Sequence, residues 1–339
     1  MKSARRRGSG AATLESVGAL AGVSRSTVSR VVNSLPGVSK RTTEAVLDAI
    51  EQLGYVPNQS AKSLASNRTQ VVTALIPEDL DTFFVDPFFS SIVSGAESYI
   101  SETDLVMNMM IASKKSFRKI LDSLAGGSSD GLIVMSHHSD HELGEPLSNK
   151  IPIVFVGRPT RDAENSWYVD VDNVVAARIG VEALVDAGCE KIATIAGPLD
   201  MPVGSDRLQG YEEAVKAAGI SGPIACGDFT AASGREAAQS LLESGEGFDG
   251  LFVASDLMAR AAIQTLEEAG VRVPGDVAVV GFDDATPATS EHPYLTTVRQ
   301  DPFEQGRAAA RLLDERLKTP SMPPTALLLD TSLVRRETA

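Results

Sequence analysis

The segment from Ser24 to Asn33, SRSTVSRVVN, carries short polar and basic side chains at helical spacing. If its three valines, Val28, Val31 and Val32, face a core, the opposite face presents hydroxyl, amide and guanidinium groups. Such groups hydrogen-bond to phosphate oxygens and to the edges of bases. The pattern therefore predicts a helix that contacts nucleic acid through Arg25, Ser26, Ser29, Arg30 and Asn33.

Helical signals on both sides of this segment predict a small unit that positions it. Ser24 can cap the helix through its hydroxyl, and the link Ala21-Gly22-Val23 has the length that a helix-turn-helix needs. A further helix should begin after Ser39 as N-cap and end at Gly54, which suits a left-handed C-cap. Its apolar residues at helical spacing should close a small core: Val46, Leu47, Ile50 and Leu53.

A leucine on a short polar helix is a second feature with a chemical use. Pro57 begins the stretch PNQSAKSLASN, and proline is favoured in the first turn of a helix. Leu64 is the only large apolar residue of that stretch. An apolar side chain of this kind can enter a base step, unstack it and bend the duplex. We expect a hinge helix at about 57–69.

The charge distribution separates the first part of the chain from the rest. Residues 1–70 hold ten basic and four acidic residues, and the remainder holds 21 basic and 41 acidic ones. The net charge is thus +6 for the first part and −20 for the second, within −14 overall. A basic module on an acidic body favours nucleic-acid binding at one place. Residues 1–12, with Arg5-Arg6-Arg7 among glycine and serine, are expected to form a disordered basic tail.

Strands alternate with helices in two similar series after Gln70. This alternation predicts parallel sheets with helices on both faces. The strand DGLIVMS at Asp130 and the strand DGLFVAS at Asp249 are near copies in corresponding places, so we expect two subdomains of similar topology. The predicted fold class is therefore α/β, with a small all-α headpiece and hinge helix joined to a two-subdomain core of parallel sheets.

The residues that follow the predicted strands form a second set of candidates. Ligands of open α/β sheets bind beyond the carboxyl ends of the strands, so two facing subdomains should form a cleft there. Bidentate hydrogen bonds can hold adjacent hydroxyls and a ring can cover the apolar face of a pyranose, which makes a sugar the leading ligand class. The candidates are Asp86, Phe88, Ser136, His137, Arg158, Arg207, Phe229, Ser255, Asp256 and Asp283.

Several of these candidates also have a purely structural interpretation. Arg207 could pair within its own helix, and Asp283 could occupy an ordinary turn. Phe88 could belong to the core, and Arg25 could be a solvated residue of a first helical turn. These alternatives stay open at the level of the sequence.

Other function classes find no support in the residues. We find no phosphate-binding lysine loop, dinucleotide fingerprint, nucleophile elbow or coherent triad, so we expect neither an enzyme nor a cofactor. The run His137–Glu142, HHSDHE, lies in a predicted loop without partner ligands elsewhere, so we expect no metal. Two separated cysteines, no secretion signal and no apolar run of membrane length indicate a cytoplasmic protein without membrane contact.

The segment from Thr13 to Arg68 resembles the DNA-binding headpiece and hinge helix of the LacI/GalR family of bacterial transcription regulators. In that family the second helix lies in the major groove, and paired hinge helices insert a leucine at the centre of the site. The resemblance implies base reading by Arg25, Ser26 and Arg30, and a wedge role for Leu64. It implies contacts to phosphates and near the hinge by Ser24, Thr27, Ser29, Asn33, Tyr55 and Asn58. Gly18 departs from the alanine that is usual in the first helix.

The chain from about Val71 onward is similar to the effector-binding core that this family shares with periplasmic sugar-binding proteins. The resemblance implies effector contacts by Arg207, Phe229 and Asp283. Ser255 and Gly157 stand where members of the lactose-repressor type have asparagine and aspartate. This difference favours a sugar other than a lactose-like one. An alternative is a regulator of this type that senses a purine, a nucleoside or a phosphorylated protein. A sugar-acting α/β enzyme with an appended DNA module is a more distant alternative.

The resulting hypothesis is a nucleoid-associated homodimeric repressor of genes for sugar uptake or catabolism. It leaves its double-stranded operator DNA when a small-molecule effector, a sugar, closes the cleft. The expected parts are a DNA-binding domain at 13–56, the hinge at 57–69 and a core at 70–339. The N-subdomain should comprise about 70–168 and 299–326, and the C-subdomain about 169–298 and 327–339. No leucine heptads follow the final RRETA, so we expect a dimer rather than a tetramer.

Overall fold

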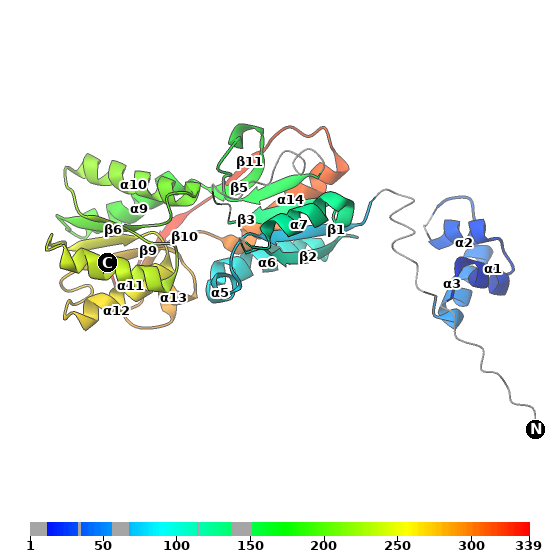
Figure 1. The fold of residues 1–339 in the computed structure, drawn as a ribbon, viewed down its shortest axis with the longest axis horizontal. Helices are drawn as coiled ribbons and strands as arrows, with labels where there is room; N and C mark the ends of the chain where they lie inside the picture. Colours follow the sequence, from blue (N-terminus) through cyan, green and yellow to red (C-terminus); the bar gives the residue numbers. More distant parts are fainter. Residues whose placement is uncertain (1–11, 33–34, 56–67, 114, 137, 139–150) are drawn as a thin grey trace, which may run out of the picture. The chain divides into compact units, whose positions relative to one another are not determined.

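Helices build the first of the two units of the chain, which span residues 1–69 and 70–339 (Figure 1). The structure, a computed structural model, describes residues 12–32, 35–55, 68–113, 115–136, 138 and 151–339. In the described part of the first unit the chain forms α1 (Leu14–Ala21), α2 (Arg25–Val32) and α3 (Lys40–Leu53). The expected hinge helix lies outside the described residues, except for residues 68 and 69.

Individual side chains determine where these helices begin and end. Thr13 accepts a hydrogen bond from Ser16 N at 3.2 Å and so caps α1. Ser39 accepts one from Thr42 N at the same distance and caps α3, as the sequence predicts. Gly54 adopts φ 58°, the left-handed conformation that was expected after α3.

The core of the first unit is smaller than the apolar pattern predicts. Its buried members among the described residues are Val17, Val28, Val46 and Ala49. Leu47 and Leu53 were expected in this core, but their exposures of 53% and 38% place them on the outer side of α3. Gly18 permits close packing of α1, because a Cβ atom there would meet the carbonyl oxygen of Val23 at 2.8 Å. The missing methyl group at Gly18 therefore has a structural reason.

The second unit contains two α/β lobes, and the first lobe is built on a sheet in the order β11-β5-β4-β3-β1-β2. Each of its pairings is parallel. The strands are β1 (Val71–Ile76), β2 (Val106–Ile111), β3 (Gly131–Met135), β4 (Ile153–Val156), β5 (Trp167–Val171) and β11 (Ala326–Leu329).

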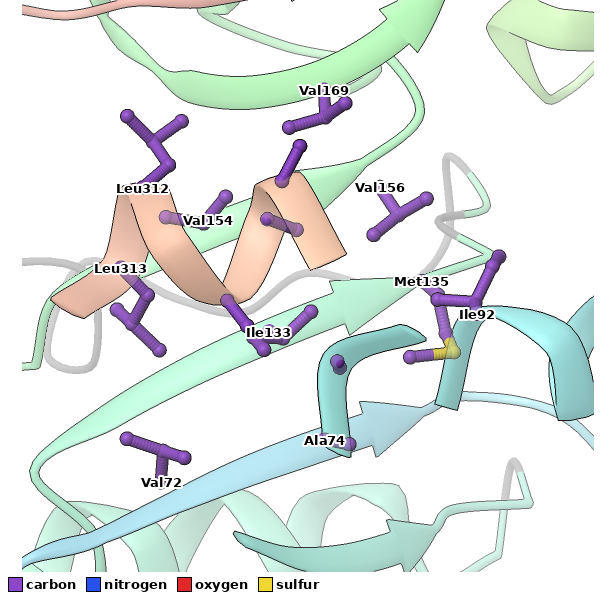
Figure 2. Packing of buried hydrophobic residues seen from close by; sticks show 14 of the residues in the cluster. Val72, Ala74, Ile92, Ile133, Met135, Val154, Val156, Val169, Leu312 and Leu313 are labelled. Atoms are coloured by element: carbon purple, nitrogen blue, oxygen red, sulfur yellow. The ribbon is translucent and has the colours of Figure 1, made fainter. Parts of the chain in front are cut away.

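Helices cover both faces of the first sheet, which explains its nearly continuous apolar strands. On one face α6 (Pro87–Ile100) packs against α14 (Pro302–Lys318), and residues such as Ile92 and Leu313 join the strand residues Val72, Ile133 and Val154 (Figure 2). On the other face α7 (Phe117–Ser123) packs on the sheet. Shorter elements are α5 (Leu80–Val85), the π-helical turn η1 (Leu124–Ser128) and the 3₁₀ turn η2 (Ala163–Asn165).

The second lobe repeats this plan with a sheet in the order β12-β10-β9-β8-β6-β7. Its strands are parallel except for β12, which is antiparallel to β10. Figure 1 shows α9 and α10 on one side of the sheet and α11 and α12 on the other. The elements are α9 (Asn173–Asp186), β6 (Ile192–Ala196), α10 (Pro202–Ala218), β7 (Ile224–Cys226), α11 (Ala231–Glu243), β8 (Gly250–Val253), α12 (Asp256–Glu268), β9 (Ala278–Asp283), α13 (Thr286–Thr289), β10 (Thr296–Arg299) and β12 (Ser332–Val334).

The chain passes between the lobes after β5, after β10 and after β11. The expected subdomain boundaries at 169, 299 and 327 fall inside these three strands, so the structure displaces each of them by a few residues. Each strand stays whole within one sheet because its backbone hydrogen bonds all belong to that sheet. The first lobe thus holds the strands up to Val171 and β11, and the second holds the strands from Ile192 to Arg299 and β12.

Candidate DNA-reading surface and ligand cavity

The first turn of α2 gathers hydroxyl groups around the helix N-terminus. Ser24 caps the helix by accepting a hydrogen bond from Thr27 N at 3.2 Å. Its Oγ also lies 2.7 Å from Ser26 Oγ and 2.9 Å from Thr27 Oγ1. Backbone N–H groups and the helix dipole make such an end favourable for a phosphate oxygen.

The two arginines of α2 are exposed, and each has a partner within the first unit. Arg25 Nε lies 3.1 Å from Glu15 Oε1 in a pair that is more than 60% exposed on both sides. An exposed pair of this kind contributes little, so Arg25 can exchange it for a DNA contact. Arg30 donates a hydrogen bond to the carbonyl oxygen of Pro36. Both guanidinium groups are therefore held near the helix without being buried.

The remaining candidates of the headpiece divide into two groups. Ser29 is half-buried on α2, and Tyr55 packs against the small core at the end of α3. Tyr55 N donates to Ile50 O at 3.0 Å, which fixes the chain as it leaves α3. Asn33, Asn58 and Leu64 lie outside the described residues.

The carboxyl ends of the strands of both lobes surround one cavity of about 280 Å³. This volume lies close to the lower end of the range for small-molecule sites. Most candidates from the sequence line it: Asp86, Phe88, Ser136, Arg158, Arg207, Phe229, Ser255 and Asp283. His137 lies outside the described residues, while its neighbour His138 lines the cavity. The rule that ligand groups follow strand ends thus brings these residues together.

Arg207, on α10, is 4% exposed and makes several oriented contacts. Its Nε donates to Asn173 Oδ1 at 3.0 Å, and Nη1 donates to the Ala254 carbonyl oxygen at 2.5 Å. The guanidinium carbon lies 3.5 Å from the centroid of the Phe282 ring. Burial lowers the pKa of Arg207, and nearby carboxylates, Asp283 first, oppose that effect. The alternative interpretation, in which Arg207 pairs only within its own helix, is wrong, because its partners come from other elements.

Asp283, at the end of β9, faces the cavity in a strained backbone conformation. Its φ of 117° is unusual for a residue with a side chain, and such strain concentrates at functional sites. Asp283 Oδ1 accepts from Gln300 Nε2 at 2.6 Å. Burial raises the pKa of Asp283 to about 7, with Arg207 lowering it and Asp86 raising it. The carboxyl group can therefore donate or accept a hydrogen bond near neutral pH.

Asp256 was predicted to contact the ligand, but it does not line the cavity. Its side chain is fully buried. It accepts hydrogen bonds from Thr297 Oγ1 at 2.6 Å and from Ala285 N at 2.9 Å. As the first residue of α12 its side chain turns toward β9 and β10, while Ser255 caps the helix at Met258 N. Asp256 thus holds the loop that carries Asp283.

Aromatic and acidic residues complete the walls. Phe229 has φ 70°, and its ring fills the space beside Gly197, where a Cβ atom would lie 2.4 Å from the ring. Phe88 lines the cavity and also packs against the core of the first lobe, so its packing role is confirmed and its ligand contact stays a prediction. Asp86 caps α6 by accepting from Phe88 N at 2.9 Å, and burial raises the pKa of its carboxyl group.

Ionisable residues in or beside the cavity that the sequence analysis did not name as candidates are Glu78, His138, Asp200 and Asp206. Arg158 Nη2 donates to both carboxylate oxygens of Asp206 at 2.7 Å. His138 Nδ1 lies 2.8 Å from Asp200 Oδ2, and His138 Nε2 lies 3.1 Å from Glu78 Oε1. Glu78 and Asp200 stand shortly after β1 and β6, so the strand-end rule could have found them. Asp206 lies within α10 and carries no such signal.

Metal and membrane contacts find no further support. Among the described residues, no group of three or more His, Cys, Asp or Glu side chains is arranged to hold a metal ion. Most of the histidine-rich run at 137–142 lies outside that part of the chain. No helix within the described ranges is long and apolar enough to cross a membrane.

A helical headpiece with a polar first turn, joined to a two-lobed α/β core around a cavity, defines a ligand-responsive DNA-binding protein. Two family models match: "Bacterial regulatory proteins, lacI family" over residues 13–58 and "Periplasmic binding protein-like domain" over residues 181–339. The transcriptional regulator CelR of Thermobifida fusca is 42% identical over 333 residues, which are 96% of this chain and 97% of that protein. The chain belongs to the LacI family, and it is a DNA-binding transcriptional regulator.

Solved structures agree with this family and with the predicted fold class. A complex of a transcriptional regulator CelR with cellobiose is 41% identical, with a TM-score of 0.77 over 97% of this chain and all of that chain. The lac repressor dimer bound to operator and the anti-inducer ONPF is 28% identical, with a TM-score of 0.85 over 96% of this chain and 98% of that chain. The resemblance and the α/β fold predicted from the sequence are confirmed.

Proposed function

We propose that the chain is a dimeric repressor whose hold on operator DNA is released by a neutral sugar. The observation that carries this proposal is the combination, in one chain, of the α2 surface with the Arg207–Asp283 pair in the cavity. Oriented donors and acceptors on a cavity wall suit the adjacent hydroxyls of a saccharide. The aromatic ring of Phe229 supplies the apolar contact that a pyranose face needs.

The charges around the cavity favour a ligand without a phosphate group. Among the described residues that line it, three are cationic side chains, and each already has a carboxylate partner: His138, Arg158 and Arg207. Acidic residues outnumber them: Glu78, Asp79, Asp86, Asp170, Asp228 and Asp283. An anionic ligand would have to displace these pairs and approach like charges, which disfavours sugar phosphates and phosphorylated proteins.

A β-linked glucose disaccharide is the first effector to test. The solved structure of a transcriptional regulator CelR in complex with cellobiose is 41% identical to this chain. The cavity of this chain also combines hydroxyl-binding groups with the rings of Phe88 and Phe229. We therefore propose cellobiose or a close analogue as the inducer, and genes for its uptake or breakdown as the targets.

The headpiece is proposed to act as one half of a symmetric reader. Two copies would place α2 in successive major grooves, one helical turn apart on a pseudo-palindromic operator. Base contacts are assigned to Arg25, Ser26 and Arg30, and phosphate contacts to the hydroxyls around Ser24. The paired hinge segments would bend the centre of the site with Leu64. Acting on chromosomal DNA, the protein would work in the nucleoid.

Ligand screening tests this proposal against the alternatives. Thermal unfolding of the full chain is measured with cellobiose, glucose, glucose 6-phosphate and hypoxanthine, since a ligand of the native state raises Tm. Cellobiose or another neutral saccharide should give the largest rise, and calorimetry should give binding without turnover. A stronger rise with hypoxanthine would move the assignment to a purine sensor, and conversion of the bound sugar would point to an enzyme.

A further inference from the structure

Buried amide side chains stand at two of the places where the chain crosses between the lobes. Asn173 is the first residue of α9, two positions after the end of β5. Gln300 lies in the crossing from β10 to α14. A buried amide needs partners for its donors and for its acceptor, so each of these side chains must be satisfied on two sides.

Asn173 connects the first lobe to Arg207. Its Nδ2 donates to Asp170 Oδ1 at 3.1 Å and to the Val171 carbonyl oxygen at 3.3 Å, both on β5 of the first lobe. Its Oδ1 accepts a hydrogen bond of 3.0 Å from Arg207 Nε, on α10 of the second lobe. The partners fix the orientation of the amide, because a guanidinium group can only donate and a carbonyl oxygen can only accept.

Gln300 makes the corresponding connection at the other crossing. Its Nε2 donates to Asp283 Oδ1 at 2.6 Å, at the end of β9 in the second lobe. Its Oε1 accepts a hydrogen bond of 2.7 Å from Gln305 Nε2. Gln305 is buried on α14, which packs in the core of the first lobe. The amide of Gln300 thus bonds to the second lobe through its nitrogen and to the first lobe through its oxygen.

The two connections meet at Arg207 and Asp283, whose Nη1 and Oδ1 atoms lie 3.7 Å apart at the cavity. Polar contacts therefore run from Asp170 in the first lobe, through this pair in the second lobe, and back to Gln305 in the first lobe. The side-chain bonds to the first lobe span only three residues at one crossing and five at the other. Each bond constrains the short segment about which one lobe can turn relative to the other.

We propose that Asn173 and Gln300 are positioning residues that transmit the binding of a ligand at Arg207 and Asp283 to the orientation of the first lobe. A ligand that hydrogen-bonds to this pair competes with the two amides or reorients them, because the same guanidinium and carboxylate groups serve both. The crossings then favour another conformation, and the lobes favour another angle. This inference rests on the proposed function, since it takes the ligand at this pair to control operator binding.

Loss of either amide should reduce the coupling between sugar and operator. The coupling is the ratio of operator dissociation constants with and without saturating cellobiose, and linkage requires the same ratio for sugar binding with and without operator. Asn173→Leu and Gln300→Met should each lower this ratio at least about fivefold, because a buried polar group without its partner changes an equilibrium by about that factor or more. Gln209→Met is the matched control, since Gln209 donates to Glu213 on the exposed surface of α10.

Gln305→Met separates transmission from simple support of the cavity. The substitution keeps the bond between Gln300 and Asp283 and removes the donor that belongs to the first lobe. It should lower the coupling ratio as Gln300→Met does, whereas a Gln300 that merely orients Asp283 would leave Gln305→Met with the wild-type ratio. A purely structural role of the amides would lower Tm and leave the ratio unchanged. Wild-type ratios in Asn173→Leu, Gln300→Met and Gln305→Met would therefore overturn the proposal.

The same link can be measured without any sugar. Fluorophores are attached to the full chain at one exposed position in each lobe, through Glu315→Cys and Glu243→Cys, after Cys189 and Cys226 are replaced by serine. Labelled protein is mixed with an excess of unlabelled protein, so that each dimer carries one labelled chain. Single-molecule energy transfer should show a broader distribution of distances between the lobes in the three amide variants than in the parent and in Gln209→Met. Equal distributions would contradict the proposal.

The two measurements keep this inference separate from the proposed function. Failure of cellobiose to bind would count against the proposed effector, and the sugar-free distributions would then decide the inference. Operator release by cellobiose with the wild-type ratio in all three amide variants would support the proposed function and overturn transmission through the amides.

Discussion

Arg207 Nη1 lies 3.7 Å from Asp283 Oδ1, and both side chains are almost fully withdrawn from solvent. The distance is too long for a strong hydrogen bond, so the two groups attract each other while each keeps capacity for a ligand. Arg207 donates hydrogen bonds to Asn173 and to the Ala254 carbonyl oxygen, and Asp283 accepts one from Gln300. The pair is therefore positioned before a ligand arrives, which reduces the entropic cost of binding.

The raised pKa of Asp283 predicts a pH-dependent stability. Its folded pKa of about 7 exceeds the ordinary value of 3.8, so the native state keeps a proton that the unfolded chain has lost between these values. The unfolding free energy should fall as the pH rises from about 4 to about 7. Asp283→Asn removes this penalty. At pH 8 the unfolding free energy of the variant should exceed that of the wild type by at least about 1 kcal/mol. Urea unfolding at several pH values checks this, and parallel pH profiles would contradict it.

Arg207→Ala should destabilise the core, because it leaves buried carboxylates such as Asp170 and Asp283 without their counter-charge. Breaking a buried pair typically costs about 3–5 kcal/mol. Arg178→Ala is the control, since Arg178 pairs with Glu182 on the exposed side of α9 at 3.7 Å. Thermal unfolding should show a large drop in Tm for the first variant and almost none for the second. Equal, small drops would mean that Arg207 has no role in organising the cavity.

Arg30→Ala tests base reading by α2. If Arg30 leaves the Pro36 carbonyl and makes a bidentate base contact, the substitution should cost about 1–3 kcal/mol on the operator and relax the preference at one base pair. Arg41→Ala, on the exposed surface of α3, is the control. Binding titrations on operator and on scrambled duplex compare the two. An equal loss on both duplexes would make Arg30 a phosphate contact.

Leu64→Ala tests the wedge that the family resemblance implies. The variant should bend operator DNA less and bind it more weakly, because an apolar wedge unstacks a base step to gain further contacts. Gel mobility of circularly permuted fragments reports the bend. A wild-type bend angle in the variant would remove Leu64 from the bending mechanism.

The sequence predicts the residues that line the cavity better than the contacts that join the two lobes beside it. Arg207, Phe229 and Asp283 follow strand ends or their motifs, so the topology of an α/β sheet brings them together. Asp206 escaped prediction because its partner Arg158 comes from the other lobe, 48 residues earlier in the chain. No local pattern records how two lobes meet. Asp256 was placed wrongly because adjacency to a strand end does not give the direction of a side chain.

In the headpiece too, the sequence predicts local features better than the packing between elements. The caps at Ser39 and Gly54 are local backbone effects, and the structure confirms both. The prediction that Leu47 and Leu53 belong to the core is wrong. Apolar residues at helical spacing form a stripe on α3 that is wider than the short helices α1 and α2 can cover.

One ligand equilibrium is proposed to control DNA binding by this protein. The most direct measurement is fluorescence anisotropy of an operator fragment, selected from genomic DNA by the purified full chain, titrated at fixed salt with and without cellobiose. Operator affinity of the wild type should fall at least about tenfold with the sugar, since coupling energies of 1–3 kcal/mol are typical. Asp283→Ala should bind the same fragment equally well and ignore the sugar. An operator affinity that stays unchanged with every ligand that binds the cavity would contradict the account.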